Sequence, residues 1–149
     1  MAFKLGKESL VEMLKNRLSG LFSQDKRIIA AYLFGSHADG SAYEGSDLDL
    51  GIMLDPASEQ GFTLNDELDL EAKIEAVLRT DKFDLVVINN VPLTLQFRII
   101  SPAKLIYVRD DDKRCEREEQ IMSRYYDFQP RLQEFNREYF AALREEYGR

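Results

Sequence analysis

The sequence contains a single cysteine and a single histidine in 149 residues. Cys115 has no second thiol with which to form an internal disulfide, and neither Cys115 nor His37 has neighbours at the spacing of zinc ligands. These absences argue against a disulfide-stabilised fold, a zinc site and thiol chemistry.

Long apolar runs and an excess of positive charge are also missing. No segment approaches the roughly 18 apolar residues that a membrane span needs, and the first ten residues lack an apolar signal core, so we expect a cytoplasmic protein that does not enter a membrane. The formal net charge is −7. Because affinity for phosphate backbones comes mainly from clustered Lys and Arg, we expect no stable binding to nucleic acid.

No internal repeat and no linker rich in Pro, Gly or Ser divides the chain. Apolar residues make up 44% of it, which is enough for one hydrophobic core. We therefore expect one domain over residues 1–149, with a core at 1–112 and a helical extension of the same unit at 113–149.

Apolar periodicity predicts both helices and strands. Spacings of three and four predict helices, and continuous or alternating apolar runs predict strands. The predicted order is a helix at 7–21, strands at 28–34 and 47–54, a helix through 64–78 and a strand at 83–88. A short helix or turn at 92–100, a short strand at 104–108 and a long helix after 110–112 follow. Pro130 should kink or divide this last helix. This order favours an α/β or α+β fold, with a small mixed sheet flanked by helices and a long C-terminal helix.

Two carboxylates stand at the start of the second predicted strand. Asp47 and Asp49 are two residues apart, and alternate strand residues project to the same side, so both can share one cation. Mg²⁺ prefers oxygen ligands and typically uses one or two carboxylates together with substrate phosphates. The pair therefore indicates a metal–nucleotide substrate.

Asp84 supplies a third carboxylate, near the start of the strand at 83–88. If that strand lies beside the one at 47–54, the three Asp side chains converge, which fits a two-metal mechanism with Asp84 as the base or the ligand on the nucleophile side. An ordinary Asp at a strand edge, or a cap, is the alternative explanation.

Gly35-Ser36 directly follows the first predicted strand. Without a Cβ atom, Gly35 lets the backbone approach a phosphate closely, and the amides of the turn and the Ser36 hydroxyl can donate hydrogen bonds to phosphate oxygens. Residues 35–46 are therefore predicted to be a phosphate-binding loop.

Other polar and aromatic residues have simpler interpretations. His37 is treated as an exposed loop histidine, Arg98 and Lys104 as surface charges that could otherwise neutralise phosphate, and Asp110 to Asp112 as a helix cap. The C-terminal aromatic residues are expected to lie mostly in the core, with some on a partner-binding face; they are Tyr125, Tyr126, Phe128, Phe135, Tyr139, Phe140 and Tyr147.

The segment GSHADGSAYEGSDLD, at residues 35–49, resembles the GSx10DxD signature of the nucleotidyltransferase superfamily of the DNA polymerase β type. The small size, the strand at 83–88, the segment at 104–110 and the aromatic C-terminal helix resemble the minimal nucleotidyltransferase (MNT) antitoxins, which pair with HEPN toxins. The similarity spans roughly residues 25–149, and only the GS and DxD motifs are specific.

This resemblance implies transfer of AMP from ATP, with Mg²⁺ in two sites, to a tyrosine of a HEPN ribonuclease toxin, and a hetero-oligomer with that toxin. By motif match, Gly35 and Ser36 would bind the triphosphate, Asp47 and Asp49 the metals, and Asp84 would be the third metal ligand and catalytic carboxylate. An antitoxin that neutralises its toxin by binding alone, and a nucleotidyltransferase with a small-molecule acceptor, are the alternatives.

Overall fold

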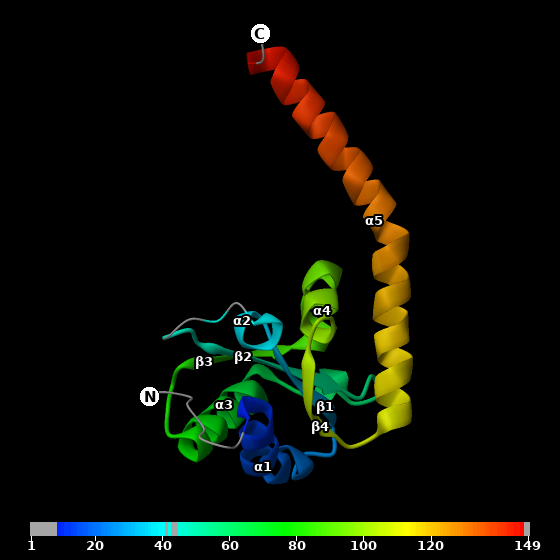
Figure 1. Ribbon diagram of the computed structural model, residues 1–149. Coiled ribbons are helices and arrows are strands. Elements are labelled where there is room, and N and C mark those ends of the chain that lie inside the picture. The colour runs from blue at the N-terminus through cyan, green and yellow to red at the C-terminus, as the bar shows by residue number, and fades with distance from the viewer. Residues whose placement is uncertain (1–8, 41, 43–44, 148–149) are drawn as a thin grey trace.

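The computed structural model describes residues 9–40, 42 and 45–147, with few side chains beyond Phe128. The elements are α1 (Leu10–Ser23), β1 (Ile28–Phe34), α2 (Ser36–Asp39), β2 (Leu48–Leu54), η1 (Glu59–Gly61), α3 (Leu64–Leu78), β3 (Phe83–Val87), η2 (Ile88–Asn90), α4 (Leu93–Ile100), β4 (Lys104–Val108) and α5 (Asp111–Tyr147), where η marks a short 3-10 helix (Figure 1).

The four strands form one mixed sheet in the order β3-β2-β1-β4. β1 pairs antiparallel with β2 and with β4, whereas β2 pairs in parallel with β3. The parallel pair is possible because α3 carries the chain from the end of β2 back to the start of β3. The predicted small mixed sheet flanked by helices is therefore confirmed.

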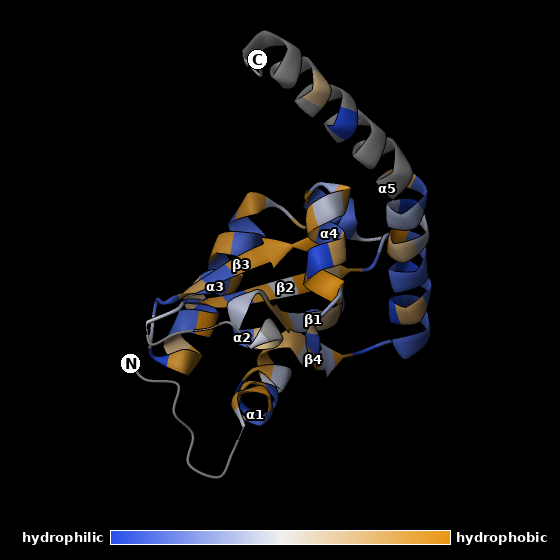
Figure 2. Cartoon of the chain, turned by 45° about the horizontal axis from the view of Figure 1, so that its top comes forward, coloured by the Kyte–Doolittle hydropathy of each residue, from blue (hydrophilic) through white to orange (hydrophobic). Residues whose placement is uncertain are grey.

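Helices cover both faces of the sheet, as Figure 1 shows, with α1 and α3 on one side and α4 and α5 on the other. All seven residues of β1 are buried, which explains its continuously apolar sequence. The strands appear as a hydrophobic layer between helices whose outer surfaces are more polar in Figure 2. One apolar cluster lies between the sheet and α1 and α3, and a second lies against α4 and α5.

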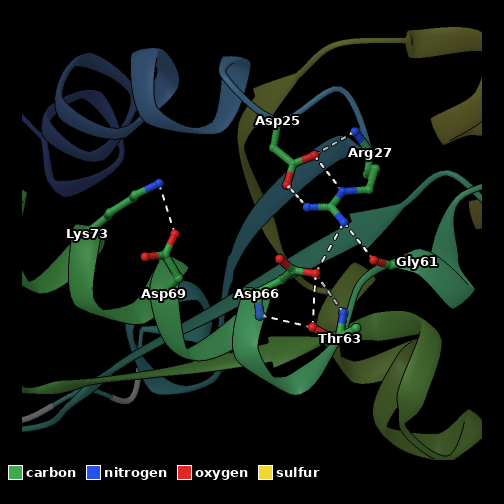
Figure 3. Close-up of polar contacts among 7 residues, drawn as sticks. All are labelled: Asp25, Arg27, Gly61, Thr63, Asp66, Asp69 and Lys73. Carbon is green, nitrogen blue, oxygen red and sulfur yellow. Dashed lines mark hydrogen bonds and ion pairs between the residues drawn. The ribbon is translucent and has the colours of Figure 1, made fainter.

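The start of α3 is fixed by a polar network (Figure 3). Thr63 and Asp66 form a capping box, in which the Thr63 hydroxyl accepts from the Asp66 amide and the Asp66 carboxylate accepts from the Thr63 amide. Arg27 donates to Asp66, to the Gly61 carbonyl and, through two nitrogens, to Asp25. The network ties the turn between α1 and β1 to the first turn of α3.

The long helix α5 is joined to the sheet near its start. The Asp110 carboxylate accepts from the Lys113 amide at 3.1 Å, which confirms the predicted cap. The buried Tyr32 hydroxyl donates to Glu118 at 2.6 Å, and this carboxylate also binds Arg114 at 2.7 Å. Burial and the neighbouring carboxylate raise the pKa of Tyr32 well above its usual range, so the hydroxyl stays protonated and donates.

Two details of the predicted elements were wrong. The loop predicted at 35–46 contains the helical turn α2. The apolar pattern that predicts the helix at 64–78 includes Leu64 and Leu68, which are exposed. The face of α3 that packs on the sheet consists of Leu70, Ile74 and Leu78, because the buried row recurs every four residues. The helix α5 continues past position 130 as one helix of 37 residues, so Pro130 does not divide it. The ribbon of α5 bends partway along its length in Figure 1, as the alternative of a kink predicts.

Some predictions concern parts of the chain outside the described residues. These are positions 7 and 8 of the first predicted helix and the side chains of Phe135, Tyr139, Phe140 and Tyr147. Across the part of the chain that the structure describes, no helix is both long enough and apolar enough to cross a membrane.

Candidate active site

The candidate site begins where β1 ends, at Gly35. Its φ of +72° lies in a region that side chains disfavour, and a Cβ atom at this position would stand 2.2 Å from Oδ2 of Asp49. Only glycine therefore leaves room for the carboxylate of the neighbouring strand. The close approach joins the two halves of the sequence motif, Gly35-Ser36 and Asp47-x-Asp49, in space.

The sheet register brings the carboxylates to one end of the sheet. Asp49 is opposite Phe34 on β1 and opposite Asp84 on β3, and Asp47 stands one residue before β2 begins. The condition set for Asp84, that its strand lie beside β2, is met. Asp49 is half-buried, while Asp47 and Asp84 are exposed, so the group is open to solvent.

The electrostatics of Asp49 show that these charges act on one another. Burial is the main cause that raises the pKa of the Asp49 carboxyl, and the negative charges of Asp84 and Asp47 raise it further. The charges of His37 and Arg98 oppose this shift. Like charges held together at a partly buried carboxyl disfavour its ionised form, so a cation bound here would relieve the repulsion.

The turn between β1 and β2 is closed by His37. Its Nε2 atom lies 3.0 Å from the carbonyl oxygen of Ser46, the residue before Asp47. His37 is half-buried, so its interpretation as an exposed loop histidine was wrong. The helical turn α2 that carries it ends at Gly40, where φ is +85°. The sequence gives no signal for the contact between His37 and the Ser46 carbonyl, because a polar residue in a loop rich in Gly and Ser can equally well be exposed.

The donor set fits a hard cation such as Mg²⁺. Three carboxylates stand at one end of the sheet, and the Asp49 carboxylate fills the space that the absent side chain of Gly35 leaves. Among the residues that the structure describes, no three His, Cys, Asp or Glu side chains are already close enough to hold a metal ion. An open set of this kind suits Mg²⁺, which keeps several waters and shares its ligands with substrate phosphates.

Sequence reasoning treated Arg98 as a surface charge that could otherwise neutralise phosphate, and it missed Gly51. Arg98 is exposed on α4, and its charge makes a minor contribution that opposes the rise in the pKa of Asp49. Gly51, two residues after Asp49 on the same face of β2, lacks the side chain that would meet Cγ2 of Ile99 at 2.6 Å. A glycine within an apolar strand is a signal for close approach, and it could have indicated the packing of α4.

Residues 16–112 match the protein family described as "Polymerase beta, Nucleotidyltransferase". The match covers more than half of the chain, includes the Gly35-Ser36 turn and all three carboxylates, and agrees with the mixed sheet. The chain therefore belongs to the polymerase β nucleotidyltransferase family. No curated protein matches the sequence significantly.

Solved structures of toxin–antitoxin systems share this fold. A chain of a toxin–antitoxin structure with AMP-PNP superposes with a TM-score of 0.67 at 20% identity, over 85% of this chain and 98% of that chain. A chain from a structure of a tri-AMPylated Shewanella oneidensis HEPN toxin in complex with an MNT antitoxin gives 0.64 at 17% identity, over 87% and 98%. A chain of a MntA-HepT structure gives 0.59 at 18% identity, over 86% and 97%.

Proposed function

We propose that this protein is an antitoxin of the MNT type that transfers AMP from ATP, in a Mg²⁺-dependent reaction, to a tyrosine hydroxyl of a HEPN toxin. The observation that carries the proposal is the approach of the Gly35 turn to Asp49, with Asp84 beside it on β3. The similarity to toxin–antitoxin structures, one with AMP-PNP and one with an AMPylated toxin, supports the choice of nucleotide and acceptor.

In the proposed reaction, the acceptor oxygen forms a bond to the α-phosphorus of ATP. The bond between this phosphorus and the bridging oxygen breaks, and pyrophosphate leaves with the electron pair. The Gly35-Ser36 turn would hold the triphosphate, and Asp47 and Asp49 would hold the metal ions. Bound Mg²⁺ would neutralise charge on the phosphates and lower the pKa of the attacking hydroxyl.

Asp84 is the proposed acceptor of the hydroxyl proton. It is exposed on β3, which is an edge strand, whereas the Gly35-Ser36 turn follows the interior strand β1. A protein acceptor can therefore approach Asp84 from outside the sheet while the triphosphate lies on the side of β1. In this arrangement the acceptor and the leaving pyrophosphate lie on opposite sides of Asp49.

Neutralisation by binding alone is a second candidate, favoured by an aromatic surface. Phe97 on α4 stacks on Tyr125 of α5, with ring centroids 3.9 Å apart and planes 8° from parallel. Tyr126 packs edge-on against both rings and is 57% exposed, and Phe128 is also exposed. Exposed aromatic side chains are enriched at protein interfaces, so this surface suits a partner protein.

One experiment separates the two candidates. The protein is incubated with labelled ATP, Mg²⁺ and the product of the neighbouring gene, beside an Asp47→Ala/Asp49→Ala variant. We expect the wild-type protein to label the partner and to block its toxicity, and the variant to do neither. A control with the same loss of charge, Glu75→Ala/Glu119→Ala, changes exposed residues outside the site and should label normally. If no label appears while wild-type and variant neutralise equally, catalysis is refuted and binding alone stands.

A further inference from the structure

β3 forms one edge of the sheet, and Figure 2 shows it as the outermost strand on that side. Its five residues, Phe83–Val87, are apolar except for Asp84. Asp84 is exposed and Phe83 is half-buried, so the start of the strand is accessible. The proposed proton acceptor therefore stands on an edge strand, at its accessible end.

The pairing of β3 with β2 determines which of its backbone groups point outward. The Leu48 amide donates to the Lys82 carbonyl at 3.1 Å. Because alternate residues of a paired strand turn their amide and carbonyl groups to opposite sides, Lys82 and Asp84 face β2, whereas Phe83 and Leu85 face the outer edge. Within the part of the chain that the structure describes, no group forms a hydrogen bond with these outward amides and carbonyls.

The two edges of the sheet differ in their protection against further pairing. Natural edge strands are commonly protected by lysine, proline, an inward charge or a β-bulge. The opposite edge strand, β4, begins with Lys104 and has a register shift against β1 between Ala31 and Tyr32. β3 pairs with β2 without a register shift and contains neither lysine nor proline, and its one charge, Asp84, belongs to the site. The edge beside the site is thus the less protected one.

The chemistry of this edge also defines what it can bind. A row of unpaired amide and carbonyl groups is matched by another extended backbone, whereas a helix uses the same groups internally. Side chains opposite one another on adjacent strands are about 5 Å apart. A hydroxyl side chain opposite Asp84 on an added strand would therefore reach the Asp84 carboxylate, which lies beside Asp49 in the register.

We propose that an extended segment of the acceptor protein pairs with the outer edge of β3 at Phe83 and Leu85, and that this pairing brings the acceptor hydroxyl to Asp84. The proposal rests on the proposed function for the existence of a protein acceptor. It adds the way in which that acceptor is held, by hydrogen bonds between backbones at the sheet edge. The side chains of the acceptor segment would then set which residue reaches the site.

The first test measures amide hydrogen exchange by NMR in the whole protein, alone and bound to the product of the neighbouring gene, without ATP. We expect the Phe83 and Leu85 amides to exchange about 10-fold or more slowly in the complex. The Asp84 and Val86 amides face β2 and are the internal control, because their exchange should change little. A complex that leaves Phe83 and Leu85 unprotected would overturn the proposal. So would protection of both amides in the protein alone that rises with its concentration, because a second copy of this chain would then occupy the edge.

The second test blocks the edge and keeps the sheet. Proline is tolerated as the first residue of an edge strand, and at Phe83 its ring would replace an N–H that points away from β2. Phe83→Ala removes the same side chain and keeps the N–H, so it is the matched control. We expect both variants to bind ATP equally, and Phe83→Pro to transfer AMP to the neighbouring-gene product about 10-fold or more slowly than Phe83→Ala. Equal rates of transfer would refute the pairing.

Failure of the proposed function gives a different result. If the Phe83 and Leu85 amides become protected in the complex but no AMP is transferred, the reaction is refuted and the pairing stands. If AMP is transferred while the two amides stay unprotected, the pairing is refuted and the reaction stands.

Discussion

Replacing Gly35 with alanine tests the close approach on which the site depends. The new Cβ would stand 2.2 Å from Oδ2 of Asp49, whereas ordinary contacts begin near 3.4 Å, so the carboxylate or the turn must retreat by about 1 Å. The backbone at Gly35, with φ +72° and ψ −150°, adds strain of about 1–3 kcal/mol for a residue with a side chain. Displacing a catalytic group by about 1 Å can cost about 100-fold in rate, so we expect at least that loss of AMP transfer.

Two other glycines provide matched controls for this substitution. Gly40 also has a positive φ, of +85°, but a Cβ atom added there would have no neighbour within 4 Å, so Gly40→Ala should lose about 1–2 kcal/mol of stability and keep most of its activity. Gly20 lies inside α1 with equally open space, and Gly20→Ala should gain about 0.5–1 kcal/mol.

The measurements for this series are urea denaturation and the initial rate of AMP transfer at saturating ATP. The predicted pattern is a loss of both stability and rate for Gly35→Ala, of stability alone for Gly40→Ala, and of neither for Gly20→Ala. If Gly35→Ala transferred AMP as fast as Gly40→Ala, the contact between the turn and Asp49 would have no catalytic importance.

Three further predictions concern packing and pH. Gly51→Ala should lower the free energy of unfolding by about 1–3 kcal/mol, because the new Cβ atom overpacks against Ile99. In a double-mutant cycle measured by denaturation, the loss in Gly51→Ala/Ile99→Ala should be smaller than the sum of the two single losses. Additive losses would contradict the contact. Tyr32→Phe removes the hydrogen bond to the Glu118 carboxylate on α5 and should lower the free energy of unfolding by about 1.5–3 kcal/mol. Amide hydrogen exchange in the first turns of α5 should become faster, and unchanged exchange would contradict a role of this bond in holding the helix. The hydrogen bond from Arg27 lowers the pKa of Asp25, so the stabilisation by ionised Asp25 is complete above the usual aspartate pKa and is lost as the pH falls. Between about pH 5 and pH 2, the free energy of unfolding should therefore fall less steeply in Asp25→Asn than in wild type. Curves of stability against pH that run parallel for the two proteins would refute this prediction.

The sequence was sufficient to predict the elements that depend on local patterns. β1 is apolar at every position because both of its faces are covered, and β2 starts at the predicted pair of carboxylates. The Asp110 cap was predictable because capping depends on a few neighbouring residues. These features need no knowledge of what packs against them.

Features that depend on tertiary contacts could not be predicted in the same way. Leu64 and Leu68 continue an apolar helical pattern, yet they are exposed because the sheet contacts only the row through Ile74. The approach of Ile99 on α4 to Gly51 on β2 joins positions 48 residues apart in the chain, and no local pattern predicts it. Pairing of β3 with β2 was likewise a condition that the sequence left open.

The central claim is that this site transfers a nucleotidyl group, and the position of the label in ATP tests it most directly. Parallel reactions with the neighbouring-gene product receive ATP labelled at either the α- or the γ-phosphate. We predict that the α-label appears on the acceptor and that the γ-label leaves entirely in pyrophosphate. Transfer of the γ-label to the acceptor would contradict nucleotidyl transfer at Asp47, Asp49 and Asp84. So would the absence of any label from the acceptor in a reaction with folded wild-type protein that neutralises the toxin.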